Sequence, residues 1–128
     1  MSPMEAESEC AFLNEIGLVD GVITNDSDVF LFGGQNVYRN MFKQDKQIEN
    51  YSIADIQQKC NLDRSKLISL SQLLGCDYCD GIVGIGPTIA NEIIQNFSNL
   101  SQFKQFLQNP NNTEKKLSRK LVRLKIYF

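Results

Sequence analysis

The hydrophobic and polar positions along the chain predict a short α/β stretch followed by helices. Ala6, Cys10, Leu13 and Gly17 recur at helical spacing, which predicts a helix over about 3–16 that ends at the glycine. At the start of this helix, Ser2 is suited to the N-cap position and Pro3 to the first helical position.

Three short stretches after that helix are typical of strands. Residues 22–24 form a β-branched run between Gly and Asn, as expected of a buried strand. Residues 37–42 alternate well enough for a second strand, and 49–52 are expected to form a third. One strand is well marked and two are weaker, which is few for a complete parallel sheet.

The remainder of the chain has a helical pattern. Helices are expected at 53–60, from the capping Asp63 to Gly75, after Pro87, at 99–107 and at 113–124. The sequence therefore predicts two parts: an α/β region over 1–75 and a helical region over 76–128.

Composition narrows the cellular setting. No run of apolar residues reaches the length of a membrane span, and the acidic N-terminus does not resemble a secretory signal. Cys10, Cys60, Cys76 and Cys79 are therefore expected to be free thiols in a reducing compartment. A single C-x-x-C at 76–79, without a second pair or a histidine, does not favour a zinc site.

Charge is unevenly divided along the chain. Residues 1–38 hold seven acids and no Lys or Arg, whereas the rest holds thirteen bases and eight acids. This division fits a metal-using enzyme that acts on a polyanion, but chance clustering on solvated faces fits it as well.

The absence of histidine limits the chemistry. Ser-His-Asp and Cys-His catalysis and most zinc hydrolase sites need a histidine, and this chain has none. Clustered carboxylates that bind Mg²⁺ remain available, and two such metals can hydrolyse a phosphodiester.

Five acidic residues are candidates for that role, each with a structural alternative. Glu5 and Glu7 lie in the first turn of the predicted helix, where a capping box or an ordinary exposed acid is the alternative. Asp26 and Asp28 directly follow the well-marked strand, where ligands often bind, although Asp also suits a turn or a cap. Asp77 follows a helix end and could be an ordinary solvated loop residue.

Two further segments could contact phosphates. The glycine-rich turn at 81–87 opens a helix, so its backbone N–H groups could approach a phosphate, although it could also be a plain connection between helices. Under either interpretation Ile82 and Ile85 would anchor the turn. Basic side chains surround a leucine stripe near the C-terminus, where a solvated helix face is the alternative. Those basic residues are Lys116, Arg119, Lys120 and Arg123.

Taken in order, these motifs resemble the flap-endonuclease superfamily of 5′ nucleases. Residues 5–11 are similar to its E-A-E-x-x-C-A segment, and 24–28 to its T-x-D-x-D metal motif. Residues 73–78 are similar to its L-L-G-x-D-Y segment, and 81–87 to the G-I-G-P turn of its helix–two-turn–helix. Within the superfamily, 2–7, 19–24, 26–34 and 37–42 look most like the xeroderma pigmentosum group G branch. The Val-Tyr-Arg-Asn at 37–40 also occurs in Holliday-junction resolvases of the superfamily.

The resemblance implies a function. It implies a PIN-like 5′-nuclease α/β layer followed by a helix–two-turn–helix region, in a nuclear endonuclease that cuts DNA in nucleotide excision repair. The substrates would be duplex/single-strand junctions such as bubbles and flaps, and two Mg²⁺ ions, for which Mn²⁺ can substitute, would activate water. Metal binding would fall to Glu5, Glu7, Asp26, Asp28 and Asp77. DNA contact would fall to Gly81, Ile82, Gly84, Ile85, Gly86, Lys116, Arg119, Lys120 and Arg123.

The chain also departs from the family pattern. The family's N-terminal region, with a first strand and two further metal aspartates, is not in this sequence and would have to be supplied in cis or in trans. Gly81 replaces a frequent serine, so a monovalent cation at that loop would be bound by backbone carbonyls. The alternatives are a junction-DNA-binding module without catalysis, a Holliday-junction resolvase, and a helical protein-interaction domain.

Overall fold

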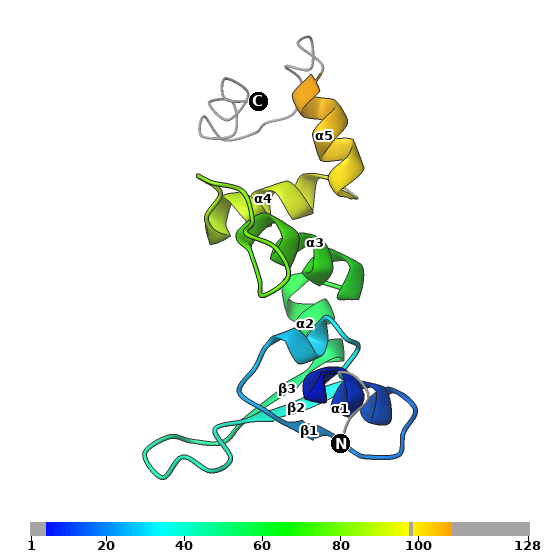
Figure 1. The fold of residues 1–128 in the computed structure, drawn as a ribbon, viewed down its shortest axis with the longest axis vertical. Coiled ribbons are helices and arrows are strands. Elements are labelled where there is room, and N and C mark those ends of the chain that lie inside the picture. Colours follow the sequence, from blue (N-terminus) through cyan, green and yellow to red (C-terminus); the bar gives the residue numbers. More distant parts are fainter. Residues whose placement is uncertain (1–4, 98, 109–128) are drawn as a thin grey trace. The chain divides into compact units, whose positions relative to one another are not determined.

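The computed structural model describes residues 5–97 and 99–108, which form two compact units of mixed α/β and helical structure. In chain order the elements are α1 (Ala6–Glu15), β1 (Val22–Ile23), the 3₁₀ turn η1 (Asp28–Phe30), β2 (Asn36–Arg39), β3 (Glu49–Ser52), α2 (Ile53–Cys60), α3 (Arg64–Leu74), α4 (Pro87–Asn96) and α5 (Leu100–Gln108) (Figure 1). None of the helices among these residues is long and apolar enough to cross a membrane.

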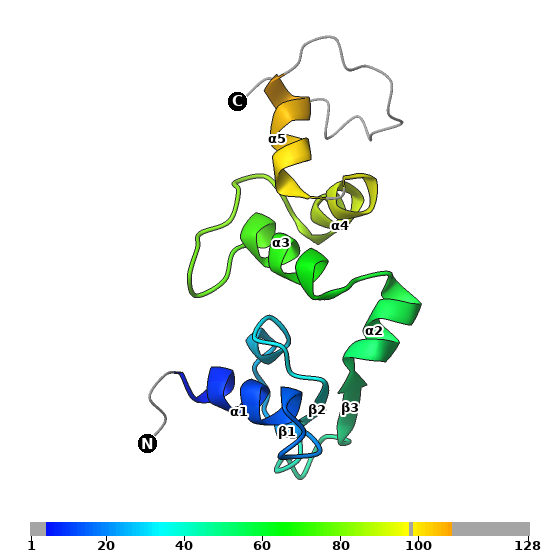
Figure 2. The same ribbon diagram turned by 90° about the vertical axis from the view of Figure 1, so that its right-hand side faces the viewer.

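Unit 1, Met1–Leu67, is built on a three-stranded mixed sheet in the order β1-β2-β3. β1 pairs with β2 in parallel, with Val22 opposite Val37, and β2 pairs with β3 in the antiparallel sense. α1 packs against β1 and η1 and runs beside the sheet (Figure 2). The core cluster consists of Ala11, Val22, Val29 and Val37, with Phe30 and Phe32 packed against it.

The sheet confirms the three expected strands, two of them with different bounds. β1 covers only the first two of the three residues predicted at 22–24. β3 has the predicted bounds, but β2 ends at Arg39 and not at 42. The strand stops because Asn40 adopts a left-handed conformation with φ of 59°, which cannot continue a strand.

The start of α1 is also different from the prediction. The helix begins at Ala6, and Glu5 is its extended N-cap residue, so a capping box with Ser2 at the N-cap and Glu5 inside the helix is wrong. Glu7 and Glu9 lie in the first turn that results, where negative charge complements the positive end of the helix dipole. Residues 1–4 lie outside the described residues.

Side chains cap both helices that follow the sheet, and of the two caps only Asp63 was predicted from the sequence. The Ser52 hydroxyl accepts a hydrogen bond from the backbone N–H of Ala54 at the start of α2. The Asp63 carboxylate accepts one from the N–H of Lys66 at 2.8 Å, which caps α3. Arg64, the first residue of α3, donates to the carbonyl of Leu31 and so ties the helix to the chain after η1.

Unit 2, Ile68–Phe128, is helical in its described part. Its buried residues are Leu73, Ile85, Ala90, Ile93, Ile94, Phe97 and Phe103. The Phe97 ring packs against Phe103 at 5.4 Å and against Phe106 at 5.3 Å between centroids. α4 and α5 confirm the helices expected after Pro87 and near 99–107. The helix expected at 113–124 lies outside the described residues, and the two units divide before the boundary predicted after Gly75.

Candidate metal and nucleic-acid site

The turn after β1 is held by two successive hydrogen bonds from backbone to side chain. The N–H of Asp26 donates to the Thr24 hydroxyl at 3.0 Å, and the N–H of Asp28 donates to the Asp26 carboxylate at 2.9 Å. Both are short-range bonds between residues two apart, as in the turns that Thr and Asp favour. These two bonds fix the backbone over the five residues from Thr24 through Asp28. The Asp26 side chain is exposed, and Asp28 is half-buried at the start of η1.

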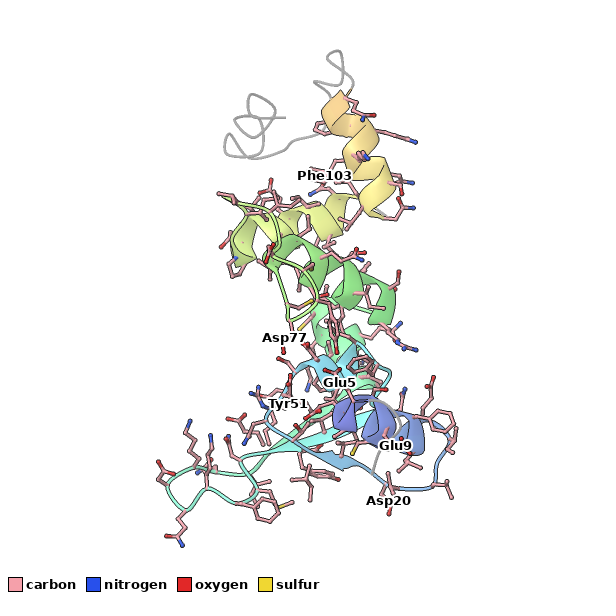
Figure 3. All side chains as sticks on the ribbon, in the orientation of Figure 1. Glu5, Glu9, Asp20, Tyr51, Asp77 and Phe103 are labelled. Atoms are coloured by element: carbon pink, nitrogen blue, oxygen red, sulfur yellow. The ribbon has the colours of Figure 1, made fainter. Side chains whose placement is uncertain are left out.

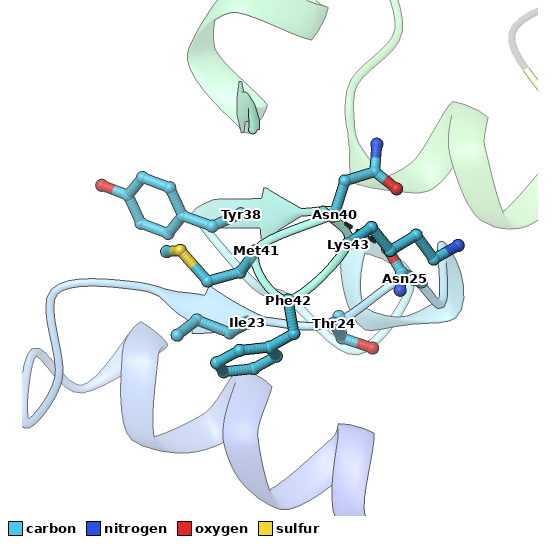
Figure 4. A pocket seen from close by; sticks show the side chains of 8 residues that line it. All are labelled: Ile23, Thr24, Asn25, Tyr38, Asn40, Met41, Phe42 and Lys43. Atoms are coloured by element: carbon cyan, nitrogen blue, oxygen red, sulfur yellow. Dashed lines mark hydrogen bonds between the residues drawn. The ribbon is translucent and has the colours of Figure 1, made fainter. Parts of the chain in front are cut away.

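The Arg39–Asn40 corner supports this turn from β2. The Arg39 guanidinium donates to the carbonyl of Asn25 at 2.7 Å, and the N–H of Asn40 donates to the Asn25 side chain at 2.9 Å. An open pocket of about 250 Å³ lies at this corner, and Figure 4 shows Asn25 and Asn40 at one end of it. The residues that line it are Ile23, Thr24, Asn25, Tyr38, Asn40, Met41, Phe42 and Lys43.

Glu5 at the N-cap of α1 and Glu7 in its first turn belong to the same unit as Asp26 and Asp28. Glu5 lies at the N-terminal end of α1, with Glu9 farther along the helix (Figure 3). α1 packs against η1 through the core cluster. The two segments that carry the acidic residues, the start of α1 and the turn before η1, are therefore attached to the same hydrophobic core.

Asn14 fixes α1 to the chain that flanks β1 and β2. Only 6% of this residue is exposed. Its side-chain N–H donates to the carbonyl of Val19 at 3.0 Å, and its oxygen accepts from the N–H groups of Gln35 at 2.7 Å and Asn36 at 3.1 Å. Asn14 carries no local sequence signal for this role, because its partners lie up to 22 positions away.

In unit 2, Asp77 lies on a two-residue turn between Cys76 and Cys79. The backbones of these cysteines pair as an isolated antiparallel bridge, with N–H to carbonyl distances of 2.8 and 3.0 Å. Asp77 (labelled in Figure 3) and its neighbour in the turn, Tyr78, are both exposed according to their surface area.

The glycine-rich loop before α4 is anchored as expected. The N–H of Ile82 donates to the carbonyl of Leu73 at 2.9 Å, and the N–H of Ile85 donates to the carbonyl of Ile82 at 3.0 Å. Ile85 is buried and Ile82 half-buried, whereas Val83 at the tip is 97% exposed. Gly84 has a positive φ, and Gly86 is the N-cap residue of α4.

The described residues contain no group of three or more His, Cys, Asp or Glu side chains that could hold a metal ion. Four of the five candidate carboxylates belong to unit 1, and Asp77 belongs to unit 2. The four basic candidates for DNA contact, Lys116, Arg119, Lys120 and Arg123, lie outside the described residues. The metal and DNA-binding assignments stay predictions.

Comparison with known proteins decides the family. The XPG I-region family profile matches residues 1–77. The chain belongs to this family. The XPG I-region chain is 46% identical to the DNA repair protein RAD2 of Saccharomyces cerevisiae, over 94% of its own length and 13% of that protein. It is 41% identical to the DNA excision repair protein ERCC-5 homolog of Xenopus laevis, over 100% of its own length and 12% of that protein. The resemblance noted from the motifs is confirmed.

Solved structures agree on the fold. The XPG I-region chain is similar to the catalytic core of Rad2 in complex with DNA substrate, with a TM-score of 0.86, 44% identity and coverage of 98% of this chain and 42% of that one. It is also similar to human GEN1 in complex with Holliday junction DNA, with a TM-score of 0.71, 39% identity and coverage of 98% and 31%. The chain thus spans less than half of each of these two solved chains.

Proposed function

We propose that this chain carries part of the catalytic core of a Mg²⁺-dependent, structure-specific DNA endonuclease that acts in nucleotide excision repair in the nucleus. The observation that carries the proposal is its similarity, over nearly its whole length, to a Rad2 catalytic core solved with DNA substrate. A chain that spans 42% of that core needs the rest of it, in cis or in trans, for cleavage. Bubble and flap junctions are the proposed substrates.

The proposed metal ligands are Glu5, Glu7, Asp26, Asp28 and Asp77, directly or through water. Hard oxygen ligands of this kind suit Mg²⁺, and a related GEN1 structure has been solved with product DNA and Mg²⁺. Two bound Mg²⁺ ions would supply activated water and offset the charge that develops on phosphate. The Asp26 side chain is exposed, and the hydrogen bond from the N–H of Asp28 orients it. This orientation supports the proposal that its carboxylate would bind a metal ion.

The two predicted regions of the chain would have different roles. Residues 1–75 would supply most of the metal ligands, and 76–128 would hold duplex DNA. The N–H groups of Ile82 and Ile85 donate to carbonyls within the protein and so anchor the glycine loop. The proposed donors to a phosphate would be the other backbone N–H groups of the loop, next to the start of α4. The proposed DNA contacts are Gly81, Ile82, Gly84, Ile85, Gly86, Lys116, Arg119, Lys120 and Arg123, with a monovalent cation bound by backbone carbonyls of the loop.

The decisive experiment places this chain in a complete core. Residues 1–128 replace the matching segment of the Rad2 catalytic core, and cleavage of bubble DNA is measured with Mg²⁺, Mn²⁺ or a chelator. We expect cutting with either metal and none with the chelator. Asp26→Asn keeps an oxygen to accept from the N–H of Asp28 but removes the charge, so cleavage should fall by about 100-fold or more.

Asp45→Asn is the matched control, because Asp45 is an exposed acid on the turn before β3. It should leave cleavage unchanged. Equal cleavage by the Asp26 and Asp45 variants would show that Asp26 only shapes its turn.

A second candidate is a Holliday-junction resolvase. It is favoured by 39% identity, over 98% of this chain, to human GEN1, which has been solved in complex with Holliday junction DNA. A four-way junction in the same cleavage assay separates the two, since a resolvase cuts it in preference to a bubble. Tight, salt-sensitive binding of either junction without cutting by the complete core would identify a non-catalytic binding module.

A further inference from the structure

Cys76 and Cys79 are a thiol pair held close together by the backbone. Their sulfur atoms lie 3.6 Å apart, and both residues are half-buried. The two backbone hydrogen bonds between them hold the turn closed, and the Cys79 sulfur also lies 3.8 Å from the carbonyl of Ser71. Cys10 and Cys60, in contrast, are exposed and belong to two different helices.

The loop that carries the pair is closed at its base by two glycines. A Cβ atom on Gly81 would lie 2.5 Å from the backbone nitrogen of Gly75, so the chain segments that enter and leave the loop approach each other closely. The bond from Ile82 to the carbonyl of Leu73 lies next to this contact. The backbone of the loop therefore holds the pair in place, in addition to the contacts of the two sulfur atoms.

We propose that Cys76 and Cys79 are a thiol–disulfide modification site that a small-molecule disulfide such as oxidised glutathione converts to an internal disulfide. An S–S bond of about 2.05 Å requires a Cα–Cα separation of about 4.4–6.8 Å. Directly paired residues of an antiparallel bridge are separated by about 5.5 Å, so the backbone already has the required spacing. Rotation of the two side chains is enough to close the remaining gap between the sulfurs.

The reaction consists of two exchanges. One cysteine, as thiolate, attacks a sulfur of the glutathione disulfide, which forms a mixed disulfide and releases one glutathione. The other cysteine loses its proton and attacks the protein sulfur of that mixed disulfide, which closes the internal bond and releases the second glutathione. Two protein thiols are oxidised and one glutathione disulfide is reduced to two thiols. Such exchange inside a reducing compartment is typical of redox-sensing cysteines.

The disulfide would close a ring around Asp77 and Tyr78. If Asp77 is a metal ligand, which rests on the proposed function, oxidation fixes the backbone of that ligand. The thiol chemistry itself does not depend on nuclease activity and is tested separately.

The test uses the whole chain with Cys10→Ser and Cys60→Ser, so that only the pair remains. After incubation with oxidised glutathione and alkylation of free thiols, trypsin releases the peptide from Leu67 to Lys104, which contains both cysteines and no internal Lys or Arg. We expect this peptide to be lighter by two hydrogen atoms and to carry no alkyl group. With Cys79→Ser added, Cys76 should form only the mixed disulfide.

A comparison with unfolded chain tests the role of the fold. In one glutathione buffer, the ratio of disulfide to dithiol in the folded chain should exceed that in the urea-unfolded chain by about tenfold. An equal or smaller ratio overturns the proposal, and so does a folded pair that yields only mixed disulfides or unreacted thiols. Circular dichroism of each variant verifies that it is folded.

Discussion

Asn14→Ala tests whether a single buried amide holds unit 1 together. The substitution removes one donor and one acceptor oxygen, and with them the hydrogen bonds to Val19, Gln35 and Asn36. Each such bond contributes about 1 kcal/mol net, and a buried partner left without one costs about 1–3 kcal/mol. Alanine regains about 0.6 kcal/mol as the better helix former. The expected loss of stability is therefore about 2–4 kcal/mol.

The assay measures thermal and urea unfolding of the whole chain, with circular dichroism as the signal that monitors unfolding. Asn91→Ala is the matched control, because Asn91 lies exposed inside α4 and its side chain accepts only a long 3.5 Å bond from Gln95. It receives the same gain in helix propensity and should change stability by less than about 0.5 kcal/mol. Asn14→Ala should lower the melting temperature by about 8 °C or more.

Hydrogen exchange locates the effect. The amides of Gln35 and Asn36 donate to the Asn14 oxygen, so they should lose protection in Asn14→Ala. Asn14→Asp keeps that oxygen but places a second one against the carbonyl of Val19, so it should protect both amides and still lower stability. A melting temperature for Asn14→Ala equal to that of the Asn91 control would refute this reasoning.

Three other predictions concern single positions. Gly81→Ala should destabilise unit 2 by about 3 kcal/mol or more in urea unfolding, because a left-handed φ of 73° and overlap with the backbone of Leu74 and Gly75 add together. Asp63→Ala should cost about 1 kcal/mol through the lost cap of α3, while Asp63→Asn keeps most of the stability. The Tyr51 hydroxyl donates to Glu49, and this bond and the negative charge raise the pKa of Tyr51 above 10.0 against the opposing effect of Arg39. Glu49→Gln should lower that pKa in a phenolate absorbance titration. Since the folded pKa is the raised one, the stabilisation is present below about pH 10 and lost as pH rises through the folded pKa.

Local signals predicted most of the regular structure. The β-branched run at 22–24 and the capping residue Asp63 mark elements that the structure confirms, because each depends on neighbours within four positions. The 3₁₀ turn at η1 was not predicted. Its apolar residues Val29 and Phe30 are fixed by packing against α1 and β1, which no local pattern reports.

The candidate site divides in the same way. The motif at 24–28 was found from the sequence, and its bonds span two positions. Arg39 and Asn40 brace that motif from about 15 positions away, and the sequence analysis noted them only as part of a resemblance. Their role depends on the pairing of β1 with β2, which brings Asn25 beside the end of β2.

Both acidic turns are fixed by protein contacts alone. The Asp26 turn is held by Thr24 and by the Arg39–Asn40 corner, and the Asp77 turn by the paired backbones of its flanking cysteines. A carboxylate on a backbone fixed in this way loses less conformational freedom when it binds a cation than one on a mobile loop. The proposed binding of a cation at either turn would therefore cost little ordering of the backbone.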